Sequence, residues 1–178
     1  MNPTPATTAP ADLTAYAQAF AVRAHADTNH LYDGQPYSAH LQLVYDFGRR
    51  YQALVPAADV PYALAACWTH DTIEDCRLTY NDVKAVCGEV VAEITYALTN
   101  EKGRTRQERA NAAYYAGIRA TPLAAFVKVC DRLANAQYSR DHGSRMLDGY
   151  RREYAHFRAE LWSAELAPMF EELAAVLA

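Results

Sequence analysis

The sequence predicts an all-α fold, a compact bundle of about eight to ten helices. Two observations carry this prediction. Apolar residues recur every three or four positions along most of the chain, which is the period of a helix buried on one face. Neither the alternating runs typical of strands nor an Asn-Gly hairpin signal interrupts that pattern. The 178 residues, 51% hydrophobic and 21% charged, suit a single globular domain.

The N-terminal segment divides into a tail and a first helix. Residues 1–10 are rich in Pro, Thr and Ala, and we expect them to be a disordered tail, with residues 11–178 forming the single domain. The first helix should begin near Asp12 and end between His25 and His30. Its apolar stripe consists of Leu13, Tyr16, Ala17, Phe20 and Ala24.

A loop and a second helix follow. Asp33-Gly34 and Gln35-Pro36 are strong turn signals, so residues 31–37 should form a loop. The next helix has an apolar face that consists of His40, Leu43, Val44 and Phe47. Taken alone, the position of His40 on such a face is more typical of a hydrogen-bonded core histidine than of a metal ligand.

Residues 65–76 are the centre of the functional prediction, because they begin as an apolar helix and become acidic without a turn residue. A continuous helix places four side chains on one face: His70, Asp71, Glu74 and Asp75. The Asp71–Asp75 repulsion costs about 0.2–0.5 kcal/mol, and each acid near the negative helix end costs about 0.3–1 kcal/mol. A bound cation would make these unfavourable electrostatic energies favourable, so we interpret the stretch as a metal site rather than a solvated acidic helix end.

Two capping boxes and a basic segment come next. Thr79 and Asp82 should cap a short helix that ends at Gly88, and another helix should follow over residues 90–99. Thr105-x-x-Glu108 is the second capping box. The basic cluster around it consists of Lys102, Arg104, Arg106 and Arg109. A solvated basic face and a phosphate-binding patch explain the cluster equally well, since arginine can bind two phosphate oxygens at once.

Pro122 predicts the start of a central, nearly all-apolar helix. Asp131 and Asn135 lie four residues apart on it, and a buried Asp is costly unless it pairs with a cation such as Arg132 or binds a metal. Gly143-Ser144 should end this segment. Two amphipathic helices then complete the bundle, with apolar residues that include Tyr150, Phe157, Leu161, Leu166, Met169, Phe170, Leu173 and Leu177.

Three apolar helices therefore contribute side chains that can ligate a metal. These are His40, His70, Asp71 and Asp131. Two imidazoles and two carboxylates suit a divalent ion of the manganese or iron type better than a thiolate-preferring ion. Because no second ligand set is evident, we expect one metal with positions left for water and substrate.

This arrangement resembles the HD-domain phosphohydrolase superfamily, which has a histidine, a later His-Asp pair and a final Asp. Within it, the sequence is similar to the hydrolase domain of RelA/SpoT proteins and to small alarmone hydrolases, over roughly residues 10–160. The matching segments are Ala24-His25, Asp33 to His40, His70 to Asp75, Thr79 to Gly88, Leu98-Thr99 and Lys128 to Asn135.

The resemblance implies a role for each matching residue. The metal ligands would be His40, His70, Asp71 and Asp131, and the ion would be Mn²⁺, as is usual in this family. Glu74 and Asp75 would handle the attacking water and its protons, and Asn135 and Tyr154 would contact the nucleotide. The basic residues expected to bind substrate phosphates are Lys102, Arg104 and Arg109.

The chain also departs from the family pattern. The Arg-Lys pair that contacts the guanine nucleotide, before the Gly-x-Pro-Tyr loop, is replaced by His30-Leu31-Tyr32, with one extra residue. A threonine shortly after Asn135 is replaced near Tyr138. The metal-binding pattern is thus complete, whereas the residues for base and ribose recognition differ.

The leading hypothesis is a metal-dependent nucleotide phosphohydrolase, with (p)ppGpp 3′-pyrophosphohydrolysis to GDP or GTP and pyrophosphate as the implied reaction. The alternatives are a phosphatase for NADPH or another nucleotide, and a nucleotide-binding regulator without catalysis. A purely structural helical module leaves the buried acids unexplained. Because imidazoles must be neutral to ligate a metal, activity should fall below about pH 6.

Net charge, pI and cysteine usage limit which binding partners and cell compartment we expect. A net charge of -4 and a pI of about 5.8 argue against nucleic acid as the main partner and allow a small anionic ligand. No signal peptide or membrane-spanning run is evident, and the four cysteines form no Cys-x-x-Cys pair, so we expect a cytoplasmic protein. The sequence leaves a homo-oligomer open.

Overall fold

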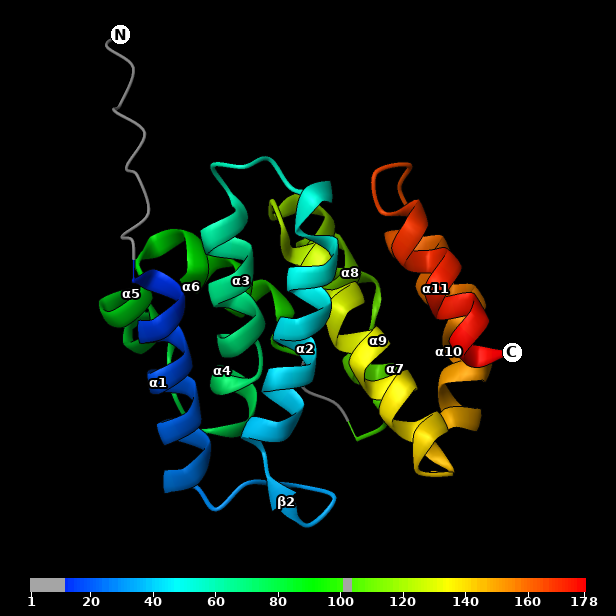
Figure 1. Cartoon of the computed structure of the whole chain (residues 1–178), viewed down its shortest axis with the longest axis horizontal. Coiled ribbons are helices and arrows are strands. Elements are labelled where there is room, and N and C mark those ends of the chain that lie inside the picture. Colours follow the sequence, from blue (N-terminus) through cyan, green and yellow to red (C-terminus); the bar gives the residue numbers. More distant parts are fainter. Residues whose placement is uncertain (1–11, 101–103) are drawn as a thin grey trace, which may run out of the picture.

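Helix α3 (Val60–Thr69) lies at the centre of the helical bundle in the computed structural model, which describes residues 12–100 and 104–178 (Figure 1). Every residue of α3 from Ala63 to Thr69 is buried. It packs against α1 (Leu13–Asp27), α2 (Ser38–Tyr51), α6 (Glu89–Leu98) and α9 (Ala124–Asp141). The apolar composition that predicted a core helix therefore places His70, the first residue after α3, inside the molecule.

The predicted all-α class is confirmed, and nine of the described helices have eight or more residues. The remaining helical elements are η1 (Gln52–Leu54), α4 (Thr72–Asp75), α5 (Tyr80–Cys87), α7 (Arg106–Arg109), α8 (Ala112–Ala120), α10 (Met146–Leu161) and α11 (Ala167–Leu177). None of them, nor any other helix in the described ranges, combines the length and apolarity needed to cross a bilayer. The predicted tail over residues 1–10 lies outside the described residues.

The segment predicted as a loop over residues 31–37 contains a small hairpin. Strands β1 (Leu31–Tyr32) and β2 (Gln35–Pro36) pair antiparallel, with Leu31 opposite Pro36. Asp33 and Gly34 between them have φ values of 50° and 78°. Asp-Gly favours this left-handed pair of conformations, whose twist matches that of paired strands. The turn signal was therefore correct, and the expectation that the segment lacks strands was wrong.

The acidic stretch is not one continuous helix, which corrects the sequence analysis. Helix α3 ends at Thr69, Asp71 precedes α4, and α4 ends before Cys76. The hydroxyl of Thr72 donates to the Thr69 carbonyl at 2.7 Å, and such a local bond competes with helix continuation. Glu74 therefore lies in the first turn of a new short helix rather than at the negative end of a long one.

Both predicted capping boxes are present. Thr79 Oγ1 accepts from the Asp82 amide while Asp82 accepts from the Thr79 amide, and Gly88 ends α5 with φ 84°. In the second box, Thr105 and Glu108 exchange equivalent bonds at 3.1 and 3.3 Å. Satisfying these amides fixes where each helix begins, which is why such short sequence signals predicted the boundaries well.

Helix α9 divides the molecule into two parts (Figure 1). One side packs on α2 and α3, and the other is covered by α10 and α11. The helix begins at Ala124, after Leu123 adopts a left-handed φ of 68°, so Pro122 lies just before the start rather than at it. Asp131, near the middle of α9, extends its side chain toward His40 of α2 and His70 after α3.

Candidate active site

The four predicted metal ligands converge on one buried point. His40 comes from the first turn of α2, His70 and Asp71 from the junction between α3 and α4, and Asp131 from the middle of α9. His40 and His70 are each 1% exposed and Asp131 is 8% exposed. The apolar faces that bury α2, α3 and α9 against one another also carry these polar side chains inward.

The donor atoms have separations suited to a single ion. The two Nε2 atoms of His40 and His70 lie 3.4 Å apart, and His40 Nε2 lies 3.3 Å from Asp131 Oδ1. Asp71 Oδ2 lies 2.9 Å from His70 Nε2 and 3.6 Å from His40 Nε2. His40, His70 and Asp131 form a group that could hold a metal ion. The donor set fits a divalent cation with ligand bonds of about 2.0–2.2 Å.

Hydrogen bonding orients the imidazole of His70. Its Nδ1 lies 3.0 Å from the Cys67 carbonyl oxygen, which can only accept, so Nδ1 carries the proton. The lone pair of Nε2 therefore faces the other three side chains. Such a backbone contact fixes the tautomer that a metal ligand needs.

The imidazoles and carboxylates of the cluster stabilise one another's charged forms. Burial works to lower the pKa of His40, but its hydrogen bonds to Asp131 and Asp71 outweigh burial and raise that pKa to about 9. Burial opposes ionisation of Asp71, yet the adjacent His70 and His40 hold the pKa of that carboxyl well below its usual range. Without an ion, the site compensates its carboxylates with a proton, and a divalent cation can take the place of that proton.

Asp131 has a further partner, which corrects the pairing with Arg132 considered above. Burial disfavours the Asp131 carboxylate, but Lys128 Nζ lies 3.0 Å from its Oδ2 and helps to lower the pKa of Asp131. Arg132 pairs instead with Glu153 at 2.9 Å. Lys128 lies three residues before Asp131, a spacing at which helical side chains meet, whereas Arg132 is the next residue and reaches Glu153 on α10 instead.

Three stacked rings support Asp71 from the hairpin side. The Tyr37 hydroxyl donates to Asp71 Oδ2 at 2.5 Å, and its ring stacks against both His25 and His30, with centroid distances of 4.3 and 4.0 Å. His30 also lies 3.8 Å from Asp75 Oδ2. Sequence reasoning assigned no role to Tyr37 or His25, although both lie in segments that match the HD-domain pattern.

The two predicted catalytic acids differ in environment. Glu74 is exposed enough to accept from the amide and side chain of Asn100, at 3.2 and 2.9 Å. Asp75 is partly buried, and burial together with the charges of Asp71 and Glu74 raises its pKa to about 7. A carboxyl with such a pKa can accept or donate a proton near neutrality.

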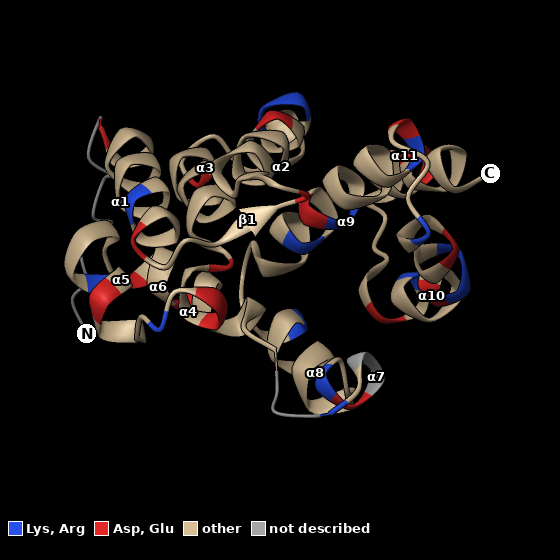
Figure 2. Cartoon of the chain, turned by 90° about the horizontal axis from the view of Figure 1, so that it is seen from below, with Lys and Arg blue, Asp and Glu red and all other residues tan. Residues whose placement is uncertain are grey.

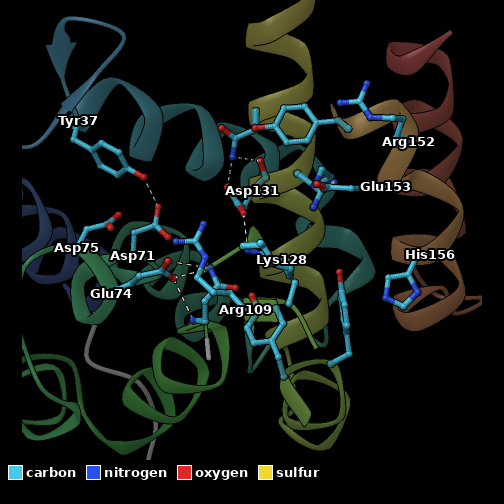
Figure 3. Close-up of a pocket in the computed structure, with 18 residues that line it drawn as sticks. Tyr37, Asp71, Glu74, Asp75, Arg109, Lys128, Asp131, Arg152, Glu153 and His156 are labelled. Atoms are coloured by element: carbon cyan, nitrogen blue, oxygen red, sulfur yellow. Dashed lines mark hydrogen bonds and ion pairs between the residues drawn. The ribbon is translucent and has the colours of Figure 1, made fainter. Parts of the chain in front are cut away.

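A cavity of about 680 Å³ opens beside this cluster (Figure 3). Figure 3 places Asp71, Glu74 and Asp75 on one side of the cavity and Arg152, Glu153 and His156 on the other. In Figure 2 the surrounding segments carry acidic residues on α4 and residues of both signs on α9 and α10. The volume is within the range of small-molecule sites.

The structure brings only some of the predicted substrate-binding residues to the cavity. Asn135 and Arg109 line it. Arg104 is not among its lining residues, and the Tyr154 hydroxyl donates to the Phe170 carbonyl at 3.3 Å. Lys102 lies outside the described residues. Arg152, Tyr150, His156 and Lys128 line the cavity without having been predicted, because no local sequence signal shows which side of an amphipathic helix faces a cavity.

Comparison with known proteins was made by sequence and by structure. No protein-family model matches the chain, and no curated protein matches it by sequence. By structure, the helical fold is shared with a solved protein, and in this chain it carries a buried His/His/Asp group that could hold a metal ion. A particular solved structure with this fold is described as a metazoan ortholog of SpoT that hydrolyzes ppGpp and plays a role in starvation responses. It superimposes with a TM-score of 0.74 over 96% of both chains, at 19% sequence identity.

Proposed function

We propose that this protein is a metal-dependent phosphohydrolase of a nucleotide, with ppGpp as its substrate and GDP and pyrophosphate as its products. The observation that carries this proposal is the convergence of His40, His70, Asp71 and Asp131 beside a cavity of nucleotide size. The solved structure of similar fold, which hydrolyzes ppGpp, supports the same reaction class. Mn²⁺ is the proposed ion, since two imidazoles with two carboxylates suit it.

The ion and the two acids beside Asp71 would have different roles in this reaction. A bound divalent ion would supply an acidified water and polarise the phosphoryl oxygen. Glu74 and Asp75, at the rim next to Asp71, orient the attacking water and take its proton. The pKa of about 7 for Asp75 lets that side chain pass the proton on to the departing group or to solvent near neutral pH.

Two cations of the cavity would offset the charge that develops on the phosphoryl group. Lys128 lines the cavity and is held beside Asp131, where the carboxylate outweighs burial and keeps the pKa of the amine well above its usual value. Arg109 also lines the cavity. A fixed ammonium and a guanidinium in a partly water-excluded site stabilise phosphate oxygens well.

Turnover of ppGpp with Mn²⁺, against a panel of nucleotides that includes NADPH, tests the proposal. Metal content is measured on the same sample. Asp71→Ala should lose bound metal and at least about 100-fold in kcat/KM, whereas Asp46→Ala, an exposed change on α2, should keep both. Normal hydrolysis by Asp71→Ala would refute the assignment of the site.

One hydrogen bond in the structure is the reason to test a second substrate. Tyr32, in place of the family's guanine-contacting pair, donates to Asn135 Oδ1 at 3.0 Å and so engages the expected nucleotide contact. A different nucleotide, such as NADPH, is therefore the alternative substrate. Bound nucleotide without phosphate release from any member of the panel would instead indicate a regulator that has lost catalysis.

We also infer that residues 11–178 act as one cytoplasmic domain with a small nucleotide as partner. The nine described helices of eight or more residues all contribute to a single apolar core, which supports a one-domain organisation. Gel filtration at several concentrations tests whether the domain forms a homo-oligomer.

A further inference from the structure

The hairpin side of the site is closed by the residues that replace the missing base contacts. Tyr32 Oη donates to Asn135 Oδ1 at 3.0 Å, and Asn135 Nδ2 donates to the Asp131 side chain at 2.5 Å and to its carbonyl at 3.1 Å. The amide of Asn135 is thus engaged at both its oxygen and its nitrogen. A base approaching from this side would have to displace the tyrosine hydroxyl.

A second contact holds the turn of the hairpin on α9. Tyr138 Oη donates to Asp33 Oδ2 at 3.0 Å, and the ring of Tyr138 meets that of Tyr32 edge-on with a centroid distance of 4.8 Å. Tyr32 also stacks on His40, at 4.9 Å and 24° between planes. Three aromatic side chains therefore fill the space between β1 and α9.

The opposite end of the cavity, between α8 and α10, has a different character. Tyr115 and His156 both line it, and their rings meet at 88° with centroids 5.3 Å apart. Arg152 lies on the same side of the cavity, also from α10 (Figure 3). Figure 3 shows His156 and Arg152 across the cavity from Asp71 and Asp75. Two rings at a right angle can stack one face of a flat heterocycle and contact its edge.

We propose that the base of the nucleotide substrate lies at the α8–α10 end of the cavity, against His156 and Tyr115, with its phosphates directed toward Asp71 and Asp131. This orientation rests on the proposed function and adds the placement of the base. The cavity of about 680 Å³ spans both ends, so one nucleotide can reach from the rings to the metal ligands. Arg152 contributes a guanidinium beside the base, where arginine commonly packs on heterocycles.

His156 offers the cleanest test because its side chain is 63% exposed, so its replacement leaves the core intact. For the nucleotide that the wild type hydrolyses best, His156→Ala should raise KM about tenfold, the usual loss for one base–aromatic stack, with kcat changed less than twofold. His156→Phe, which keeps a ring, should restore KM. A ribose diphosphate that lacks a base should show the same KM for wild type and His156→Ala.

The matched control is Leu31→Ala in the hairpin, since Leu31 is 56% exposed and flanks Tyr32. Leu31→Ala should leave KM unchanged. An unchanged KM in His156→Ala, or a larger KM increase in Leu31→Ala, would overturn the proposal. Wild-type protein that hydrolyses no nucleotide would instead contradict the proposed function. In that event, calorimetry measures the Kd of ppGpp and of NADPH for the same variants and decides the placement of the base. His156→Ala should bind about tenfold more weakly than wild type, and Leu31→Ala should bind as wild type does.

Discussion

At the scale of single residues, the sequence indicated which side chains would come together as proposed metal ligands, but it did not indicate the partners that support them. His40 has the pattern of a core histidine, and it is indeed 1% exposed. Burial alone does not separate a core histidine from a ligand, because both occupy the apolar face of a helix. What favours a ligand is the grouping around His40 Nε2, with Asp131 Oδ1 at 3.3 Å, His70 Nε2 at 3.4 Å and Asp71 Oδ2 at 3.6 Å. These residues come from distant parts of the sequence, so helical periodicity does not reveal the grouping.

Among the residues that support the proposed ligands, Tyr37 should affect metal affinity most when it is replaced. Tyr37→Phe removes the 2.5 Å hydrogen bond to Asp71 Oδ2 while keeping the stacked ring. Because this bond orients the carboxylate, the affinity for Mn²⁺ should fall about 10-fold or more. Titration of the metal-free protein with Mn²⁺, followed by electron paramagnetic resonance, measures the change. Tyr45→Phe, which removes a hydroxyl bonded to Arg49 on the surface, is the control and should bind Mn²⁺ normally.

The proton on His40 predicts how metal binding depends on pH. The pKa of His40 is raised to about 9, above the ordinary value of 6.5, so the metal-free folded state gains stability from this proton below pH 6.5 and loses it as pH rises through 9. A metal must displace that proton. The apparent affinity should therefore weaken about tenfold per pH unit below 9, with release of about one proton per ion. Calorimetry in buffers of different ionisation enthalpy counts the protons, and a pH-independent Kd between 6 and 8 would contradict histidine ligation.

At the scale of elements, helix existence was predicted better than helix continuity. The apolar period identified α3 and the acidic residues after it, but it gave no sign that the helix stops at Thr69. The break comes from a side chain–backbone bond made by a buried threonine, and helical periodicity does not contain that information. The hairpin over residues 31–36 was missed for a related reason, since strands of two residues are too short to alternate.

Thr72→Val tests the cause of the break. The substitution keeps the shape of a 0%-exposed side chain and removes its 2.7 Å bond to the Thr69 carbonyl. The free energy of unfolding of metal-free protein should fall by about 1–3 kcal/mol, because a buried carbonyl loses a partner. Urea unfolding followed by circular dichroism measures the loss. Thr28→Val is the comparison: its hydroxyl bonds the Ala24 carbonyl at 3.3 Å in an exposed position and the His25 carbonyl at 3.1 Å in a part-buried one, so the loss of stability should be smaller there, and an equal loss would contradict the explanation.

At the scale of the whole molecule, the site exists because three inward helices share one core. The sequence predicted that α2, α3 and α9 would be apolar and would carry the metal ligands. In the structure the four side chains lie together, and their binding of a metal stays a prediction. It did not predict which residues of α8 and α10 line the cavity, because that depends on how α10 and α11 fold back over α9. Nor did the sequence analysis assign a role to Lys128 on α9, which pairs with Asp131 at 3.0 Å and lines the cavity.

This architecture predicts that metal binding stabilises the entire fold. The ion would join α2, the α3–α4 junction and α9, and the unfolded chain has no preformed site. At a Mn²⁺ concentration of about 100 times Kd, stability should rise by about 2.7 kcal/mol, which for a chain of this size is a Tm increase of about 5–10 °C. Differential scanning calorimetry with Mn²⁺ and with EDTA measures the shift. Asp131→Asn should lose most of it, whereas Asp141→Asn, an exposed change near the end of the same helix, should keep it. An equal Tm shift in both variants would mean that Mn²⁺ binds elsewhere on the molecule.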